Sequence, residues 1–227
     1  MQNRRGLFAG MQSGRLSGFV PYKGTKDLPN AGRISRFIRN FVDMKVALCQ
    51  FSMEWEAAAR NLRRAEELVA QAGADLALLP EMFATGFVTE PWRTALPDEE
   101  ELLAWMRRTA RRYATALAGS AVVRSGDRFA NRFFFVRPAG GAERYDKRHL
   151  FSIGGEDAHF VAGRRRVVVE YGGLRFLPLV CYDLRFPVWC RCRSDYDAIL
   201  CVASWPAPRR EVWRTLLRAR AIENQCY

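Results

Sequence analysis

The chain has 227 residues, of which 49% are hydrophobic and 26% are charged, and its formal net charge is +12. This length suits one globular domain, and no apolar run reaches the roughly 18 residues of a membrane-spanning helix. Basic residues alternate with acids in segments such as "ARNLRRAEELVA", a pattern typical of a solvated helix face. We therefore expect neither a membrane partner nor a nucleic-acid partner.

Residues 1–43 differ in composition from the rest of the chain. They contain eight Lys or Arg residues and only two Asp, and they lack a sustained hydrophobic period. We interpret them as a basic N-terminal extension, either disordered or translated from a misplaced start codon, and we favour this over a targeting signal. At Met44, "MKVALCQF" begins a clean strand pattern. We therefore place one folded domain at 44–227.

Strand and helix patterns alternate after Met44. A buried strand at 45–51 precedes an amphipathic helix at 54–72, which Gly73 ends. A short apolar strand follows at 75–80, and a second helix at 98–117 starts with acids and carries arginines toward its end. The remaining strands are expected near 117–124, 128–137, 165–170, 174–181 and 197–204, before a final helix in "RREVWRTLLRARAIENQCY". This alternation predicts a layered α/β fold, with a hairpin through "RSGDR".

The cysteines and histidines argue against a metal site. Six cysteines lie mostly in apolar segments, and no secretory signal precedes them, so we expect reduced thiols in a cytoplasmic protein. The histidines are only two, His149 and His159, and Cys190-Arg-Cys192 lacks the usual metal-binding spacing. A Ser-His-Asp triad is not excluded by counting, but no Gly-x-Ser-x-Gly motif is present.

Three chemically capable residues come after predicted strands, Glu81 and Cys181 directly and Lys147 beyond the predicted hairpin. Glu81 follows "LALLP", Lys147 follows "ERYD", and Cys181 follows "LPLV". Each has an ordinary explanation by itself, since charged residues are common in loops and free cysteine is often a core residue. Because neighbouring strand ends of a layered α/β fold converge on one edge, the three side chains can instead meet in one site.

Several sequence blocks resemble those of the nitrilase, or carbon–nitrogen hydrolase, superfamily. "LLPEMFATGF", "YDKRHLF" and "LVCYDLRFP" are similar to its three catalytic blocks, and "VASWPAPR" and "LLRARAIENQ" to two supporting blocks. The resemblance covers about residues 44–227. It is closest to the ω-amidase branch, which hydrolyses the terminal amide of 2-oxo acids such as 2-oxoglutaramate. Tyr182-Asp183 favours an amidase, because nitrile-hydrolysing members more often carry Trp-Glu there.

The resemblance implies a four-layer α-β-β-α sandwich. Family members usually continue for several tens of residues beyond "AIENQCY", so we expect the sandwich to be incomplete at the C-terminus. The resemblance also implies a small-molecule amide substrate, no metal or organic cofactor, and a homodimer or larger homo-oligomer. The alternatives are another branch of the superfamily, an N-carbamoyl amide hydrolase or a nitrilase, or an inactive truncated fragment that acts only as a binding protein.

The resemblance also assigns roles to residues of this chain. Cys181 would be the nucleophile and Glu81 the general base. Lys147 would favour the thiolate and, with the backbone N–H of Tyr182, bind the oxyanion. Glu156, in "SIGGEDAHF", matches the family's second glutamate, which orients Lys147 or the substrate.

Three further residues are expected in or near the substrate pocket. Phe87 and Trp205 are pocket walls or core residues. Arg185 either pairs with a substrate carboxylate or braces the turn against Asp183, and we favour the bracing role.

Overall fold

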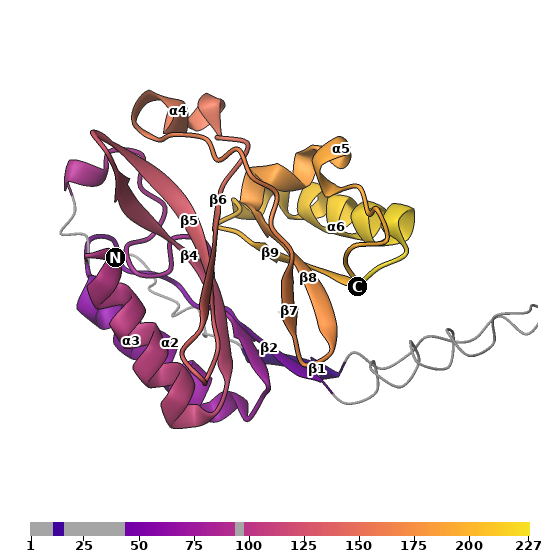
Figure 1. Cartoon of the computed structure of the whole chain (residues 1–227). Helices are drawn as coiled ribbons and strands as arrows, with labels where there is room; N and C mark the ends of the chain where they lie inside the picture. The colour runs from indigo at the N-terminus through magenta and orange to yellow at the C-terminus, as the bar shows by residue number, and fades with distance from the viewer. Residues whose placement is uncertain (1–10, 16–43, 94–97) are drawn as a thin grey trace, which may run out of the picture.

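The computed structural model describes residues 11–15, 44–93 and 98–227, which form two β-sheets and the helices that cover them (Figure 1). The larger sheet has the strand order β1-β2-β3-β4-β5-β6, and the smaller has the order β7-β8-β9. The first sheet consists of β1 (Met11–Arg15), β2 (Lys45–Cys49), β3 (Leu76–Leu78), β4 (Ala116–Ser125), β5 (Arg128–Val136) and β6 (Ala142–Asp146). The second consists of β7 (Val169–Tyr171), β8 (Leu174–Val180) and β9 (Ala198–Val202).

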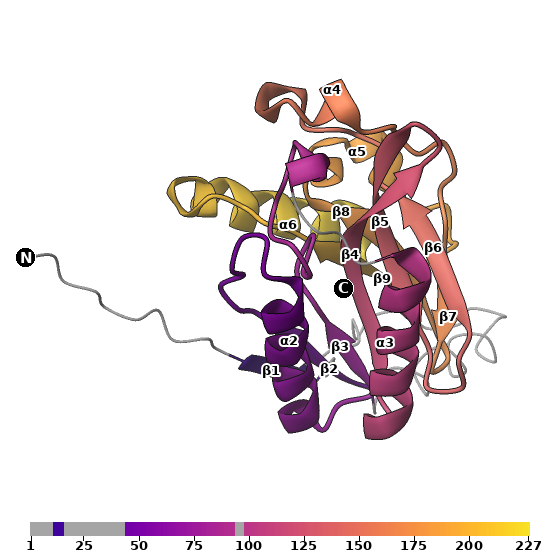
Figure 2. The same cartoon turned by 90° about the vertical axis from the view of Figure 1, so that its left-hand side faces the viewer.

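The helices lie on the outer faces of the two sheets. Helices α2 (Ala58–Ala72) and α3 (Glu99–Tyr113) cover the six-stranded sheet, while α5 (Pro187–Cys190) and α6 (Arg210–Asn224) lie outside the three-stranded sheet (Figures 1 and 2). The shorter helices are α4 (Glu156–His159) and the 3-10 turns η1 (Pro91–Arg93), η2 (Ser152–Gly154), η3 (Cys181–Arg185) and η4 (Ala207–Arg209). This is the α-β-β-α sandwich that the family resemblance implied.

The two faces of β5 show how the layers are held together. Phe134 packs with the residues of α2 and α3, while Phe133 and Phe135 pack against the second sheet, including Phe176 of β8. Successive side chains of a strand point to opposite faces, so a continuously apolar strand fills two cores at once. Tight packing also explains Gly119 of β4, where an added Cβ would lie 2.9 Å from the Leu79 Cβ and from the Phe83 ring.

Both long N-terminal helices are shorter than predicted, since α2 begins at Ala58 instead of residue 54 and α3 ends before residue 117. Gly73 ends α2 in the left-handed region as expected, with φ of 48°. The predicted helix 98–117 was too long, because it ends at Tyr113, where Ala114 takes a φ of 50°. The following residues join β4, whose strand pairing outweighs their helix propensity.

No helix within the described part of the chain is long and apolar enough to span a membrane.

Two strands were not predicted. β6 is polar along much of its length, and it is recruited by antiparallel pairing with β5, for example Arg132 with Asp146. β1 lies inside the N-terminal extension and pairs antiparallel with β2, from Met11 opposite Cys49 to Arg15 opposite Lys45. The other residues of 1–43 lie outside the described residues, so the domain boundary at residue 43 stays a prediction.

Candidate active site

Glu81, Lys147 and Glu156 meet in the interior of the protein. Glu81 lies in the turn after β3, Lys147 directly follows β6, and Glu156 begins α4. The Lys147 Nζ donates to Glu81 Oε1 at 3.0 Å and to Glu156 Oε2 at 2.8 Å, and all three side chains are fully buried. The strand ends therefore converge as the sequence pattern suggested, and one ammonium group serves two carboxylates.

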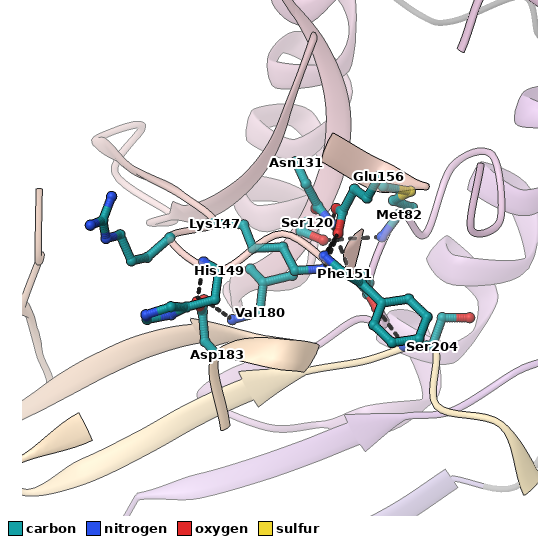
Figure 3. Close-up of polar contacts among 12 residues, drawn as sticks. Met82, Ser120, Asn131, Lys147, His149, Phe151, Glu156, Val180, Asp183 and Ser204 are labelled. Atoms are coloured by element: carbon teal, nitrogen blue, oxygen red, sulfur yellow. Dashed lines mark hydrogen bonds and ion pairs between the residues drawn. The ribbon is translucent and has the colours of Figure 1, made fainter. Parts of the chain in front are cut away.

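Asn131 of β5 links the two carboxylates, and the sequence analysis missed it. Its Nδ2 donates to Glu81 Oε1 at 2.9 Å and to Glu156 Oε1 at 3.1 Å (Figure 3). Backbone N–H groups complete the set, from Ser204 to Glu81 Oε2 at 2.8 Å and from Phe151 to Glu156 Oε2 at 2.7 Å. Buried carboxylates are stable only when hydrogen-bonded or paired, and here each oxygen has a donor.

Cys181 stands at the sharp turn between β8 and η3. Its φ is +47°, in the left-handed region that non-glycine residues rarely adopt. Such local strain persists only where neighbouring contacts hold it. Asp183 supplies one of those contacts, because its buried carboxylate accepts the backbone N–H of Val180 at 3.0 Å (Figure 3).

The pKa of the Cys181 thiol is raised well above its ordinary value, chiefly by burial. The Glu81 carboxylate raises it further, and Lys147 offsets only part of the increase. Burial alone would lower the pKa of the Lys147 ammonium, but Glu81 and Glu156 outweigh burial and raise it. Because burial and the Glu81 charge outweigh the Lys147 ammonium, the site favours the neutral thiol. Lys147 acts on the thiol in the expected direction, toward the thiolate, but its effect is smaller than those of burial and Glu81.

A pocket opens beside Cys181 and Lys147. Its other lining residues are Phe87, Phe151, Tyr182, Arg185, Ser204, Trp205, Pro206 and Arg209. The sequence analysis left open whether Phe87 and Trp205 are pocket walls or core residues. Both line this pocket.

Arg185 belongs to the pocket and does not brace the turn. Its guanidinium carbon lies 5.3 Å from the Trp205 ring centroid and 5.9 Å from that of Tyr182. The bracing contacts to the Asp183 carboxylate come from Val180, Tyr145 and His149, so the bracing role favoured from the sequence was wrong.

Arg209 is a second cation on the pocket wall, and the sequence analysis missed it. Like Arg185, it is exposed, and neither arginine forms an ion pair with any residue that the structure describes. The Arg209 backbone carbonyl accepts the indole N–H of Trp205 at 2.9 Å. The block "SWPAPR" could have pointed to this residue, because it places an arginine four residues after an expected pocket tryptophan.

The chemistry of the site follows from these contacts. The pKa of the thiol is raised by burial and by the Glu81 carboxylate, an ammonium group lies against that carboxylate, and two exposed arginines line the same pocket. This arrangement can support acyl transfer to sulfur with the carboxylate as proton acceptor. Among the described residues, no group of three His, Cys, Asp or Glu side chains could hold a metal ion.

Comparisons with known proteins agree with this geometry. The model of the family described as carbon-nitrogen hydrolase matches residues 45–227. The ω-amidase YafV of Yersinia enterocolitica is 48% identical over 185 residues, which are 81% of this chain and 72% of that protein. The 2-oxoglutaramate amidase of Bacillus subtilis is 32% identical over 189 residues, which are 80% of this chain and 73% of that protein.

A solved structure has the same architecture. The crystal structure of XC1258 from Xanthomonas campestris, a CN-hydrolase superfamily protein with an arsenic adduct in its active site, superimposes with a TM-score of 0.77. Its sequence is 42% identical, and the match covers 81% of this chain and 73% of that one.

Proposed function

This chain belongs to the carbon–nitrogen hydrolase family, the nitrilase superfamily, and from that premise we propose that it is an ω-amidase acting on small acids with a terminal amide. As a member of this family it is a hydrolase of amide carbon–nitrogen bonds. The observation that supports an acidic amide as the substrate is the composition of the pocket. It combines Cys181 with Arg185 and Arg209, which form no ion pair within the described part of the chain, so it offers a nucleophile for the amide and cations for a carboxylate.

Glu81 is the general base of the proposed reaction. Burial and the Glu81 charge favour the neutral form of the Cys181 thiol, so its proton moves to that carboxylate as sulfur attacks the amide carbon. Glu81 then gives the proton to the departing ammonia. After ammonia leaves, the same carboxylate takes a proton from water, which cleaves the thioester and releases the acid.

Lys147 and the backbone N–H of Tyr182 bind the oxyanion that forms in each half-reaction. Lys147 lines the pocket beside Cys181 and is held by Glu81 and Glu156. Tyr182 lies in the first turn of η3, where a backbone N–H has no acceptor within the helix. Donors already in place need no reorganisation when charge develops, which is the usual basis of oxyanion stabilisation.

Arg185 and Arg209 recognise the substrate carboxylate. Both guanidinium groups lie on the exposed part of the pocket lining, away from the buried Glu81 and Glu156. Arginine binds carboxylates through paired hydrogen bonds, and an arginine without an internal partner is free to do so. The names of the two curated relatives, ω-amidase and 2-oxoglutaramate amidase, support an acidic amide as the substrate.

The proposal extends to the compartment and the assembly of the protein. A cytoplasmic location is supported by its six free cysteines. A homodimer or larger homo-oligomer is supported by α6, which leaves the apolar side chains of Val212 and Ile222 40% and 76% exposed.

Ammonia release tests the proposed function directly. Purified protein is incubated with 2-oxoglutaramate or succinamate, and the Cys181→Ala variant is assayed beside it. We expect release by the wild type alone, with a neutral amide of similar size turned over more slowly. Equal release by Cys181→Ala would refute the nucleophile, and a preference for the neutral amide would refute the acidic substrate.

A further inference from the structure

Asp183 connects the segment that carries Lys147 with the turn that carries Cys181. The Asp183 side chain is completely buried, and its Oδ2 accepts the Val180 N–H at 3.0 Å, one residue before Cys181. The same oxygen accepts the Tyr145 hydroxyl at 2.8 Å, two residues before Lys147. One carboxylate therefore touches both halves of the reacting site, although neither oxygen faces the pocket.

His149 makes the second connection from the Lys147 segment. Its backbone N–H and its ring Nδ1 both bond Asp183 Oδ1, at 2.9 and 2.8 Å (Figure 3). The ring stacks on Phe186, with centroids 3.6 Å apart and planes at 6°, just beyond the end of η3. His149 is therefore held both by the carboxylate inside the turn and by the aromatic ring that follows it.

Neither residue is needed to keep Lys147 charged or to pair Glu81. Those tasks belong to Glu156, Asn131 and the Ser204 N–H. What Asp183 and His149 fix is the distance between two chain segments that approach from different sheets, β6 and β8. Displacement of reacting groups by about 1 Å can cost about a hundredfold in rate, so this distance matters to catalysis.

We propose that Asp183 and His149 are positioning residues, which hold the strained Cys181 turn at a set distance from Lys147 through the Nδ1–carboxylate bond. The role rests on the proposed function only for its effect on turnover. Its effect on the reactivity of the Cys181 thiol does not depend on any substrate. The positioning role and the proposed function can therefore be refuted by separate measurements.

Two substitutions at His149 separate the hydrogen bond from the stacking. His149→Phe keeps a ring on Phe186 and removes the Nδ1 donor. His149→Asn keeps an amide nitrogen near the Nδ1 position and removes the ring. The His149 side chain is 20% exposed, which favours folding of both variants, and circular dichroism checks it. His159→Phe is the matched control, because His159 contacts the Trp92 ring and lies outside the Asp183 contacts.

We expect His149→Phe to lower kcat for succinamate by about 10- to 100-fold with KM within about twofold, and to lower the rate of Cys181 alkylation by iodoacetamide. His149→Asn should stay within about threefold of wild type in both measurements, and His159→Phe should match wild type. If no amide is turned over by any protein, the alkylation rates alone decide the role.

The proposal is overturned if His149→Phe keeps wild-type alkylation, or if His149→Phe and His149→Asn are equally impaired, since ring packing would then explain the loss. Should His149→Phe fail to fold, Asp183→Asn replaces it. That variant keeps the shape and loses one acceptor, and wild-type alkylation in it would likewise exclude the positioning role.

Discussion

The ammonium nitrogen of Lys147 lies 3.0 Å from Glu81 Oε1, and both side chains are fully buried. Glu156 Oε2 accepts from the same nitrogen at 2.8 Å. An ion pair in the interior is costly to form and still more costly to break, because the remaining charge has no water to solvate it. Lys147 therefore supports the fold as well as the proposed oxyanion site.

Replacement of this lysine should affect both properties. We expect Lys147→Met to lower kcat by about a hundredfold or more, and to lower the free energy of unfolding by about 3–5 kcal/mol at neutral pH, because two buried carboxylates lose their cation. Kinetics and urea titration measure the two effects. The double variant Lys147→Met/Glu156→Gln removes one of those carboxylates and should recover part of the stability. Unchanged stability in Lys147→Met would contradict this reading of the pair.

The pKa of the Cys181 thiol should fall when Glu81 is neutralised. Burial raises this pKa most, the Glu81 charge and hydrogen bond raise it further, and Lys147 lowers it. Glu81→Gln removes one cause of the increase and leaves Lys147 in place, so thiolate should form at lower pH than in the wild type. Absorbance at 240 nm against pH measures the midpoint, with Cys181→Ala as the blank. An unchanged midpoint in Glu81→Gln would show that Glu81 does not act on the thiol, and a higher one would reverse the sign of its effect.

The pocket arginines should discriminate between acidic and neutral amides. Because a hydrogen bond to a charged group contributes about 1.5–3 kcal/mol, Arg185→Met and Arg209→Met should each raise KM for succinamate by about tenfold or more. KM for a neutral amide such as butyramide should stay within about twofold, since it presents no carboxylate. Steady-state kinetics with both substrates measure the ratio. Equal losses for both amides would mean that the arginines only shape the pocket.

Alkaline pH should weaken the fold through Cys49. Burial raises the pKa of the Cys49 thiol from 9.0 to about 11. Below pH 9 the thiol is neutral in both states, so its contribution is complete. As pH rises toward 11, the unfolded chain ionises while the folded one does not, and stability falls by up to about 1.4 kcal/mol per pH unit.

Cys49→Val removes this titration and keeps an apolar side chain in the core. We expect its free energy of unfolding to fall less steeply between pH 9 and 11 than that of the wild type, as measured by urea titration at several pH values. Cys192→Val is the control, because Cys192 is partly exposed. Parallel curves for Cys49→Val and the wild type would contradict the assignment.

Most of the site could be predicted because its residues sit in recognisable local patterns. Glu81 and Cys181 follow short apolar strands, and such strands and their ends are visible in the linear sequence. β6, which Lys147 directly follows, is not visible as an apolar run in the sequence. It is a strand because it pairs with β5, and most of its side chains are only partly buried. The family resemblance of "YDKRHLF" identified Lys147 where periodicity could not.

Asn131 and Asp183 show what lies beyond the reach of local pattern. Asn131 stands in the middle of a strand, 50 residues from Glu81 and 25 from Glu156, and only the two-sheet packing brings the three together. Asp183 lies close to Cys181 in the sequence, but its hydrogen-bond partners Tyr145 and His149 lie 38 and 34 residues away. The sequence around a polar residue does not reveal which distant residue will become its hydrogen-bond partner in the folded protein.

The sequence by itself predicted the α/β class and the order of most strands and helices, and it singled out Glu81, Lys147, Glu156 and Cys181 as the candidate set. The fold class and the order of elements follow from hydrophobic period, and the residue set follows from the resemblance of short motifs to the blocks of a known family; both are local properties of the chain. The tertiary structure decided the protonation preference of Cys181, the pocket position of Arg185 and Arg209, and the bracing by Asp183. Those depend on burial and on charges from distant segments, since a pKa or an ion pair is set by everything within a few ångströms in space.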